Sequence, residues 1–323
     1  METRMPFHLN SHGQPRSINT RTQPTTKHKS NLVNYRCFHI KKADRSIIFC
    51  ILVIGVIFLA QGCGMKSNMM TSLSRSILNN NDMAMVESGA PAYLIMVDGL
   101  IDQDPDSPDM LCSGARLYTA YSDVFVTDKE RKRKLSDKAM NYALKSVCLT
   151  QSNACELKQQ PFDQFSAVIS AMEKDELPFL FTLGNAWASW IMAHKDDFNA
   201  LADIARIETI MNRVIELDDT YKDGAAYLYL GTLSTFLPPA LGGKPEQGKQ
   251  YFEKAISMSR GKNLMAKVMY ANLYAKMMFD RKLFDHLLKE VIETDPNIDG
   301  YTLVNTYAQQ QAKKLMDEAD DYF

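Results

Sequence analysis

Hydrophobic residues recur every three to four positions along most of the chain after residue 82, which is the spacing of one face of an α-helix. In residues 83–103, for example, Met85, Ala92, Met96 and Leu100 lie on one stripe. No stretch sustains the alternation typical of a strand. The pattern therefore predicts an all-α protein of about a dozen helices. One begins at a cap residue, Asp109, and the others cover residues 83–103, 135–150, 162–172, 177–192, 197–216, 225–235, 245–257, 264–278, 283–294 and 301–320.

The most specific pattern lies in residues 224–259, where two short predicted helices follow one another. Gly231 in the first helix is small where a partner helix would cross closely, and Gly248, Phe252 and Ala255 recur along the second. Tetratricopeptide repeats place a small residue, an aromatic residue and an alanine at these points. The pattern predicts tetratricopeptide-like helical hairpins stacked into a superhelix, whose concave face binds ligands or partners.

An inserted loop, FLPPALGGKPE, separates these two helices. Its prolines cannot continue the first helix, and its glycines can adopt positive φ. Its apolar residues either cover the core of a neighbouring hairpin or contact a ligand or partner. The candidate contact residues of the loop are Leu237, Pro238, Leu241, Gly242 and Gly243.

Aromatic residues form a second candidate group. Trp187 and Trp190 are three apart on one predicted helix and therefore share a face, with Tyr229 and Phe236 expected nearby. They either pack in the core or form the aromatic wall of a ligand chamber. Tyr227 is the remaining candidate for ligand or partner contact.

The first 62 residues are separable from the rest. Residues 1–45 are polar and basic and are predicted to be a disordered leader, or an extension from a mis-assigned start. Residues 46–60 are fifteen uncharged, mostly apolar residues behind a basic segment, so 46–62 are predicted to be a signal peptide. Small residues just before Cys63 resemble a lipobox, which predicts lipidation of Cys63 rather than an uncleaved anchor or an ordinary signal. The predicted helical domain covers residues 63–323.

The net charge of residues 63–323 limits the kinds of partner that the protein is expected to bind. Nine of the 37 basic and two of the 38 acidic residues precede Ser46, so residues 63–323 carry a net charge of −8. This balance argues against nucleic acid as a partner, because phosphate contacts need a basic face.

Three cysteines remain after Cys63. Cys112 pairs with Cys148, or Cys148 pairs with Cys155, or all three are reduced.

No motif predicts catalysis, a cofactor or a metal site. His194 is interpreted as an exposed helix end, and the acidic segment 102–109 lacks the glycine and glutamate of a calcium loop. The basic run 129–134 is interpreted as a solvated connection, or as a contact for anionic lipid headgroups. A P-loop, a nucleophile elbow and paired CxxC motifs are absent from the sequence, so an enzyme is not predicted.

Four segments together resemble the TRAP transporter T-component family, TatT: LGNAWASWIMAHKDDFNALADIARIETIMNRVIELDDTY, LGTLSTFLPPALGGKPEQGKQYFEKAISMS, YANLYAKMMFDRKLFDHLL and the terminal DDYF. The resemblance covers nearly all of residues 63–323. Position by position, Pro238, Gly242, Gly243 and Pro245 match the family's loop motif, and Cys63 matches its lipidated cysteine. The leader before the signal departs from the family pattern.

The resemblance implies a periplasmic lipoprotein of tetratricopeptide-like hairpins that forms trimers, with a pore or cleft in each protomer. Such a protein works with the solute-binding P-component of a tripartite ATP-independent periplasmic transporter. It docks that component and holds or passes a small hydrophobic or carboxylate-bearing ligand. The alternative is an envelope scaffold that grips peptide segments in its concave face. The membrane that carries the anchor, inner or outer, does not follow from the sequence.

Overall fold

The computed structural model describes residues 72–323, which all belong to the second of two compact units, residues 63–323. The predicted leader 1–45, the predicted signal 46–62 and the predicted lipidation site Cys63 lie outside the described residues.

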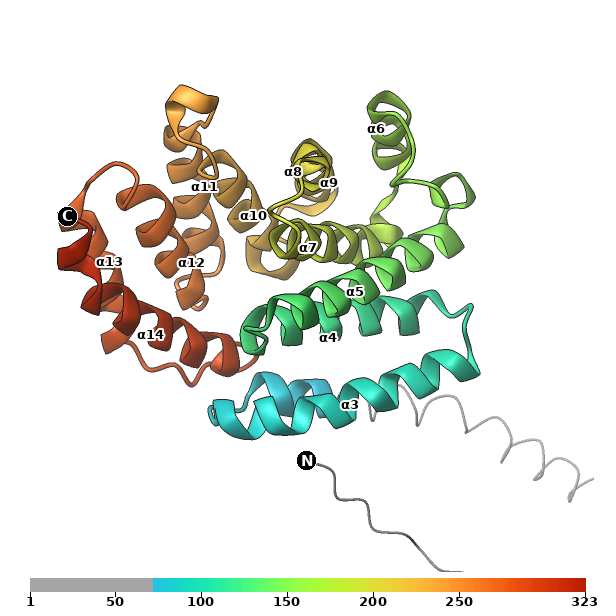
Figure 1. The fold of residues 1–323 in the computed structure, drawn as a ribbon, viewed down its shortest axis with the longest axis horizontal. Coiled ribbons are helices and arrows are strands. Elements are labelled where there is room, and N and C mark those ends of the chain that lie inside the picture. Colours follow the sequence, from blue (N-terminus) through green and yellow to red (C-terminus); the bar gives the residue numbers. More distant parts are fainter. Residues whose placement is uncertain (1–71) are drawn as a thin grey trace, which may run out of the picture. The chain divides into compact units, whose positions relative to one another are not determined.

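The described part of the chain is entirely helical, which confirms the predicted all-α class (Figure 1). A short helical segment at residues 72–78 precedes twelve α-helices, and no strand occurs within residues 72–323. The helices are α3 (Met83–Gln103), α4 (Pro108–Phe125), α5 (Lys129–Thr150), α6 (Phe162–Ala171), α7 (Leu177–Ala193), α8 (Phe198–Ala202), α9 (Ile204–Asp218), α10 (Ala225–Ser234), α11 (Pro245–Met258), α12 (Leu264–Met269), α13 (Arg281–Glu293) and α14 (Thr302–Asp317).

Local capping moves the starts of two predicted helices. Ser107, not Asp109, caps α4, because Pro108 fits the first helical position, where no backbone N–H is needed. Asp128 accepts a hydrogen bond of 2.7 Å from the backbone N–H of Arg131. This cap starts α5 at Lys129, so the prediction of a basic connection over residues 129–134 was wrong.

Two predicted helices are interrupted. The segment predicted as one helix over residues 197–216 divides at Asp203 into α8 and α9. The segment predicted over 264–278 begins as α12 and continues as a π-helical stretch, Tyr270–Ala275.

Most helices that follow one another along the chain pack together, notably α4 with α5 and α10 with α11 (Figure 1). Glycines allow the close crossings. A Cβ atom at Gly248 would lie 2.5 Å from Cγ2 of Thr235, and one at Gly184 in α7 would lie 2.8 Å from Cγ2 of Ile210 in α9. The predicted α10–α11 pair is confirmed in its position and in its close crossing.

Contacts between the ends of the described segment join its first and last helices. Helix α14 packs against α3. Just before α3, Asn79 donates a hydrogen bond of 2.7 Å to Asp299, and its side-chain oxygen accepts one of 2.6 Å from the backbone of Gly300. Arg75 forms an ion pair of 3.2 Å with the same aspartate. The helix series therefore closes on itself within residues 72–323.

Helix α3 is long and apolar enough to cross a membrane by length and composition. Its residues Tyr93, Val97 and Ile101 nevertheless pack with Leu111 of α4 in a buried cluster. The side chain of Asp98, on the same helix, accepts hydrogen bonds from hydroxyl groups of α4 and α5. In this structure α3 is thus a packed helix of the folded unit.

Candidate functional site

The backbone of the loop between α10 and α11 is tightly constrained. The N–H of Gly243 donates to the carbonyl of Pro238 (3.2 Å), and the N–H of Lys244 donates to the carbonyl of Ser234 (2.8 Å). Gly242 has a φ of 93°, and a Cβ atom at Gly243 would lie 1.7 Å from the carbonyl oxygen of Leu237. Only glycine fits at position 243, so the sequence GG fixes one compact loop conformation.

Four successive residues of this loop, at positions 237–240, face solvent. Leu237 is 41% exposed, and Pro238, Pro239 and Ala240 are also exposed. None of these four residues belongs to a hydrophobic cluster of residues 72–323. These residues thus form an exposed apolar surface on a loop that is closed by backbone hydrogen bonds.

Trp187 is fully buried in the core. Its indole N–H donates a hydrogen bond of 3.1 Å to Asp203, and its ring meets Phe165 edge to face at 5.8 Å. Arg206 pairs with the same aspartate at 3.1 Å. The arrangement satisfies the polar atom of a buried tryptophan and joins α7 to the start of α9.

Trp190 lies closer to the surface, at the end of α7. Its N–H donates a hydrogen bond of 2.7 Å to Asp137, and its ring stacks on His194 with centroids 4.6 Å apart. The ammonium group of Lys158 lies 3.6 Å from the ring centroid, a close cation–π contact. Trp190 is therefore enclosed by three polar side chains.

Tyr227 is half-buried on α10, with its ring 6.1 Å from that of Tyr251 on α11. Tyr229 packs its ring against Phe181 of α7 at 5.9 Å. Among residues 72–323, no hydrogen bond or ring contact joins the two tryptophans to Tyr227 or to the 235–244 loop. The predicted candidates thus fall into separate groups on α7, on α10 and in the loop.

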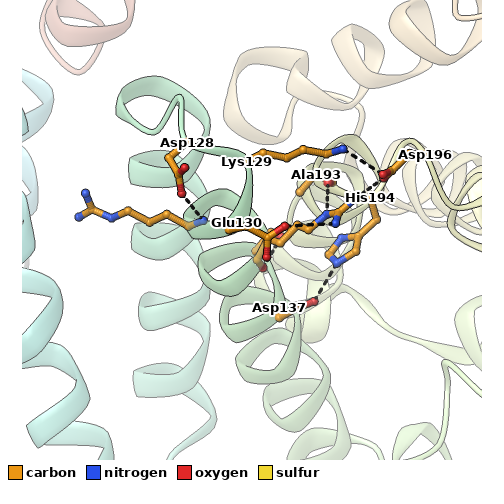
Figure 2. Close-up of polar contacts among 10 residues, drawn as sticks. Asp128, Lys129, Glu130, Asp137, Ala193, His194 and Asp196 are labelled. Carbon is orange, nitrogen blue, oxygen red and sulfur yellow. Dashed lines mark hydrogen bonds and ion pairs between the residues drawn. The ribbon is translucent and has the colours of Figure 1, made fainter.

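The basic run and the His194 segment, distant in the sequence, lie together where α5 begins and α7 ends (Figure 2). Lys129 donates a hydrogen bond of 3.0 Å to Asp196, and Arg133 pairs with the same carboxylate. Hydrogen bonds from Arg133 and Lys129 lower the pKa of Asp196. Lys129 and Arg133 thus form ion pairs that connect the start of α5 to the end of α7.

His194 ends α7 as predicted, but its side chain is only 18% exposed, so the prediction of an exposed residue was wrong. Its Nε2 lies 3.4 Å from Asp137, and Figure 2 shows the ring directed at that carboxylate. Stacking on Trp190 accounts for the burial. The pair belongs to the same α5–α7 contact.

The cysteine alternatives are resolved by a bond between Cys148 and Cys155. It joins the end of α5 to the segment before α6. Cys112 is free and buried, with its sulfur 3.3 Å from the hydroxyl of Thr182. Cys112 therefore packs between α4 and α7.

The structure reveals one charged site that the sequence analysis missed, at the turn between α9 and α10. Lys222, Asp223 and Gly224 have consecutive φ values of 48°, 55° and 76°. The ammonium group of Lys222 lies 5.1 Å from the centroid of Phe181. Surrounding protein and the positive charge of Arg116 lower the pKa of Lys222 to about 8. In the sequence, the only indication of this turn is Lys-Asp-Gly directly before the predicted helix over residues 225–235.

A second polar group lies further along the same face of α4. Asp123 is seven residues after Arg116, two helical turns along, and accepts a hydrogen bond of 2.6 Å from Ser189. Asp123 is exposed, but desolvation by the surrounding protein raises the pKa of its carboxyl. The hydrogen bond therefore joins α4 to α7 at this polar group.

Within the described range, no three His, Cys, Asp or Glu side chains are placed to share a metal ion.

Comparison with known proteins assigns this arrangement to a family. A model of the family described as "TRAP transporter T-component" matches residues 79–323, which is nearly all of the described part of the chain. An uncharacterized protein of Treponema pallidum (strain Nichols) is 21% identical over 318 residues, covering 86% of this chain and 98% of that protein.

Proposed function

Because the chain belongs to the TRAP transporter T-component family, we propose that it is a periplasmic lipoprotein that docks the solute-binding P-component of such a transporter. In this role it holds a small ligand or passes it to its partner. Lipidation of Cys63 attaches it to the membrane, and three copies form a homotrimer of tetratricopeptide-like units. The family match over residues 79–323 is the observation that carries the proposal.

The loop between α10 and α11 supports a docking role. Partner-binding surfaces combine exposed apolar residues with a backbone that needs little ordering on association. Leu237 and Pro238 are exposed, and the hydrogen bonds of Gly243 and Lys244 fix the loop beneath them. We place the contact with the P-component on this loop.

The test is capture of partners from a membrane and periplasmic extract by the full-length chain, tagged on a linker after Phe323. Retention of a solute-binding protein at fixed stoichiometry supports the proposal. Retention of unrelated envelope proteins without any solute-binding protein contradicts it and favours the envelope scaffold. Native mass spectrometry of the purified chain measures the trimer independently.

A matched pair of variants tests whether the loop forms the contact with the P-component. Leu237→Ser combined with Pro238→Ala removes apolar surface from the loop, and Phe198→Ser removes an 87% exposed apolar residue from α8. We expect the loop variant to lose at least tenfold in affinity for the P-component and the α8 variant to retain it, with both melting near the wild type. Equal affinities of all three proteins would exclude the loop as the docking surface.

A further inference from the structure

Large apolar side chains are exposed on the first two helices of the described chain. Leu73 and Leu78 lie in the helical segment at residues 72–78, and Met85 and Ile95 lie on α3. Met85 is 62% exposed and Ile95 is 71% exposed. A surface helix normally directs polar residues toward water, and contiguous exposed apolar surface marks a contact with a partner or a membrane.

A pocket shows that these two helices form one surface. It has a volume of about 250 Å³ and lies between the 72–78 segment and the N-terminal half of α3. Its lining includes Leu73, Ile77, Met85, Val86 and Tyr93. The apolar surface of the short helix is therefore continuous with that of α3.

The side of α3 that faces away from the core is open along most of the helix. Its exposed residues recur three or four positions apart and therefore share one side of the helix: Ala84, Ser88, Ala92, Ile95 and Gly99. A Cβ atom at Gly99 would have no neighbour within 4 Å. These five residues, together with Leu73, Leu78 and Met85, are called the outer face below.

The charged groups of α3 do not belong to the outer face. Asp98 is the only charged residue between Glu87 and Asp102. Its carboxylate accepts hydrogen bonds of 2.6 Å from Tyr118 on α4 and 2.8 Å from Tyr142 on α5. The outer face is thus uncharged because the one acidic side chain in this stretch is turned toward the neighbouring helices.

The position of the outer face in the chain points to the bilayer as its partner. Ser72, the first described residue, follows Cys63 by nine positions. Nine residues span at most about 32 Å even when fully extended. A lipid on Cys63 therefore keeps the outer face close to the membrane, and such a tether raises the effective concentration of a second contact. A second copy of the chain has no tether of this kind to the outer face.

The scarcity of positive charge indicates which lipids the outer face suits. Arg75 is the only lysine or arginine within residues 72–103, and its guanidinium pairs with Asp299. Attraction to anionic headgroups needs clusters of lysine and arginine. A contact made by the outer face would therefore depend on apolar burial and not on anionic lipid.

We propose that the outer face lies on the surface of a neutral lipid bilayer, with Leu78, Met85 and Ile95 inserted at the edge of the acyl chains. The contact rests on the proposed function, because the lipid on Cys63 brings the membrane within reach. It holds the helical unit in one orientation, with α3 along the bilayer surface.

Quenching of tryptophan fluorescence by brominated acyl chains tests this contact. The full-length chain is reconstituted into phosphatidylcholine vesicles, with or without bromine on the acyl chains. Ile95→Trp should lose roughly half of its added emission in the brominated vesicles, because interfacial helices bury their apolar side by about 5–10 Å. Phe198→Trp replaces an exposed residue of α8, at the opposite edge of the helical unit (Figure 1), and should lose none. Trp187 and Trp190 contribute the same background to both variants.

Both variants should melt near the wild type, since each replaces an exposed side chain. Equal quenching of the two variants, or no quenching of Ile95→Trp, would overturn the proposal. In the second case, a disulfide between two Ile95→Cys copies in the same vesicles would identify a second copy of the chain as the occupant.

A second tryptophan position tests whether the outer face acts as a unit. Leu78→Trp should be quenched like Ile95→Trp, and adding Ile95→Glu should reduce this quenching at least twofold, because a carboxylate opposes insertion. Adding Phe198→Glu instead should leave it unchanged. Added phosphatidylglycerol or salt at about 1 M should also leave it unchanged, since charge does not drive the contact. Loss of quenching in salt would refute the assignment to a neutral bilayer.

Mass spectrometry of the N-terminal peptide measures lipidation of Cys63 separately. A lipidated chain whose Ile95→Trp is not quenched keeps the anchor and loses the outer face as a membrane contact. A chain without the lipid whose Ile95→Trp is quenched when mixed with vesicles keeps the outer face and loses the anchor. Neither result depends on capture of a P-component.

Discussion

A Cβ atom at Gly231 would lie 2.8 Å from Cε1 of Phe252, closer than two carbon atoms can approach without displacement. Gly231 is on α10, and Phe252 is a fully buried residue of α11. The ring therefore rests on the backbone of α10. Because Phe252 also stacks on Tyr270 at 5.6 Å, it has little freedom to move away.

Replacing Gly231 with leucine should overpack this crossing. We expect Gly231→Leu to lower the free energy of unfolding by roughly 1–3 kcal/mol, measured by urea denaturation. A matched control is Gly99→Ala in α3, where a Cβ atom would have no neighbour within 4 Å. This control should be stabilised by roughly 0.5–1 kcal/mol, since alanine favours the helix. Equal effects of the two changes would argue against the close crossing.

Substitution at Gly243 should disrupt the α10–α11 loop. In Gly243→Ala the new methyl group would overlap the carbonyl of Leu237, so the loop must open. We expect faster amide hydrogen exchange at Gly243 and Lys244, whose N–H groups are now bonded, with helices α3 to α7 unaffected. Unchanged protection at these two amides would show that the loop tolerates a side chain.

The bond between Cys148 and Cys155 should stabilise the fold, because it reduces the conformational entropy of the unfolded chain. The two residues are seven positions apart, and a loop of this length predicts about 2.5 kcal/mol in the chain-entropy treatment. The double variant Cys148→Ser, Cys155→Ser should therefore unfold at lower urea concentration. In the wild type, thiol labelling should modify Cys112 only after unfolding, because it is buried. Labelling of Cys148 or Cys155 under non-reducing conditions, located by mass spectrometry of the digested chain, would contradict the bond.

Asp98 should make stability depend on acid pH. Burial acts to raise the pKa of its carboxyl, but hydrogen bonds from Lys138, Tyr118 and Tyr142 outweigh burial and lower that pKa. A lowered pKa in the folded state stabilises the fold above the unfolded-state pKa of about 3.9, and this contribution is lost as pH falls through the folded-state pKa.

Asp98→Asn should therefore cost roughly 1–3 kcal/mol at pH 7, and the cost should shrink as pH falls below about 4. Urea denaturation between pH 3 and pH 7 measures this difference. Asp102→Asn, an exposed carboxylate one turn further along α3, serves as the control and should change stability little at any pH. A pH-independent cost at Asp98 would mean that its charge plays no part.

Much of the helical fold was predictable because the signals are local. The 3.6-residue period placed α3 at Met83–Gln103 without error, and small residues at Gly231 and Gly248 indicated the close crossing of α10 and α11. Capping was predicted less well: the pattern did not distinguish Ser107 from Asp109, and it treated the first turns of α5 as a connection. Both errors arise because cap geometry depends on φ and ψ at single residues.

The sequence by itself determined the all-α class, the helix pair around Gly231 and the glycine-rich loop, since each depends on residues close together in the chain. Tertiary structure alone decided which charges meet. It buried Trp187 against Asp203, and it paired the basic start of α5 with Asp196. It also brought Lys222 over the ring of Phe181, because charge and ring contacts form between segments whose separation in the sequence carries no information about their distance in space.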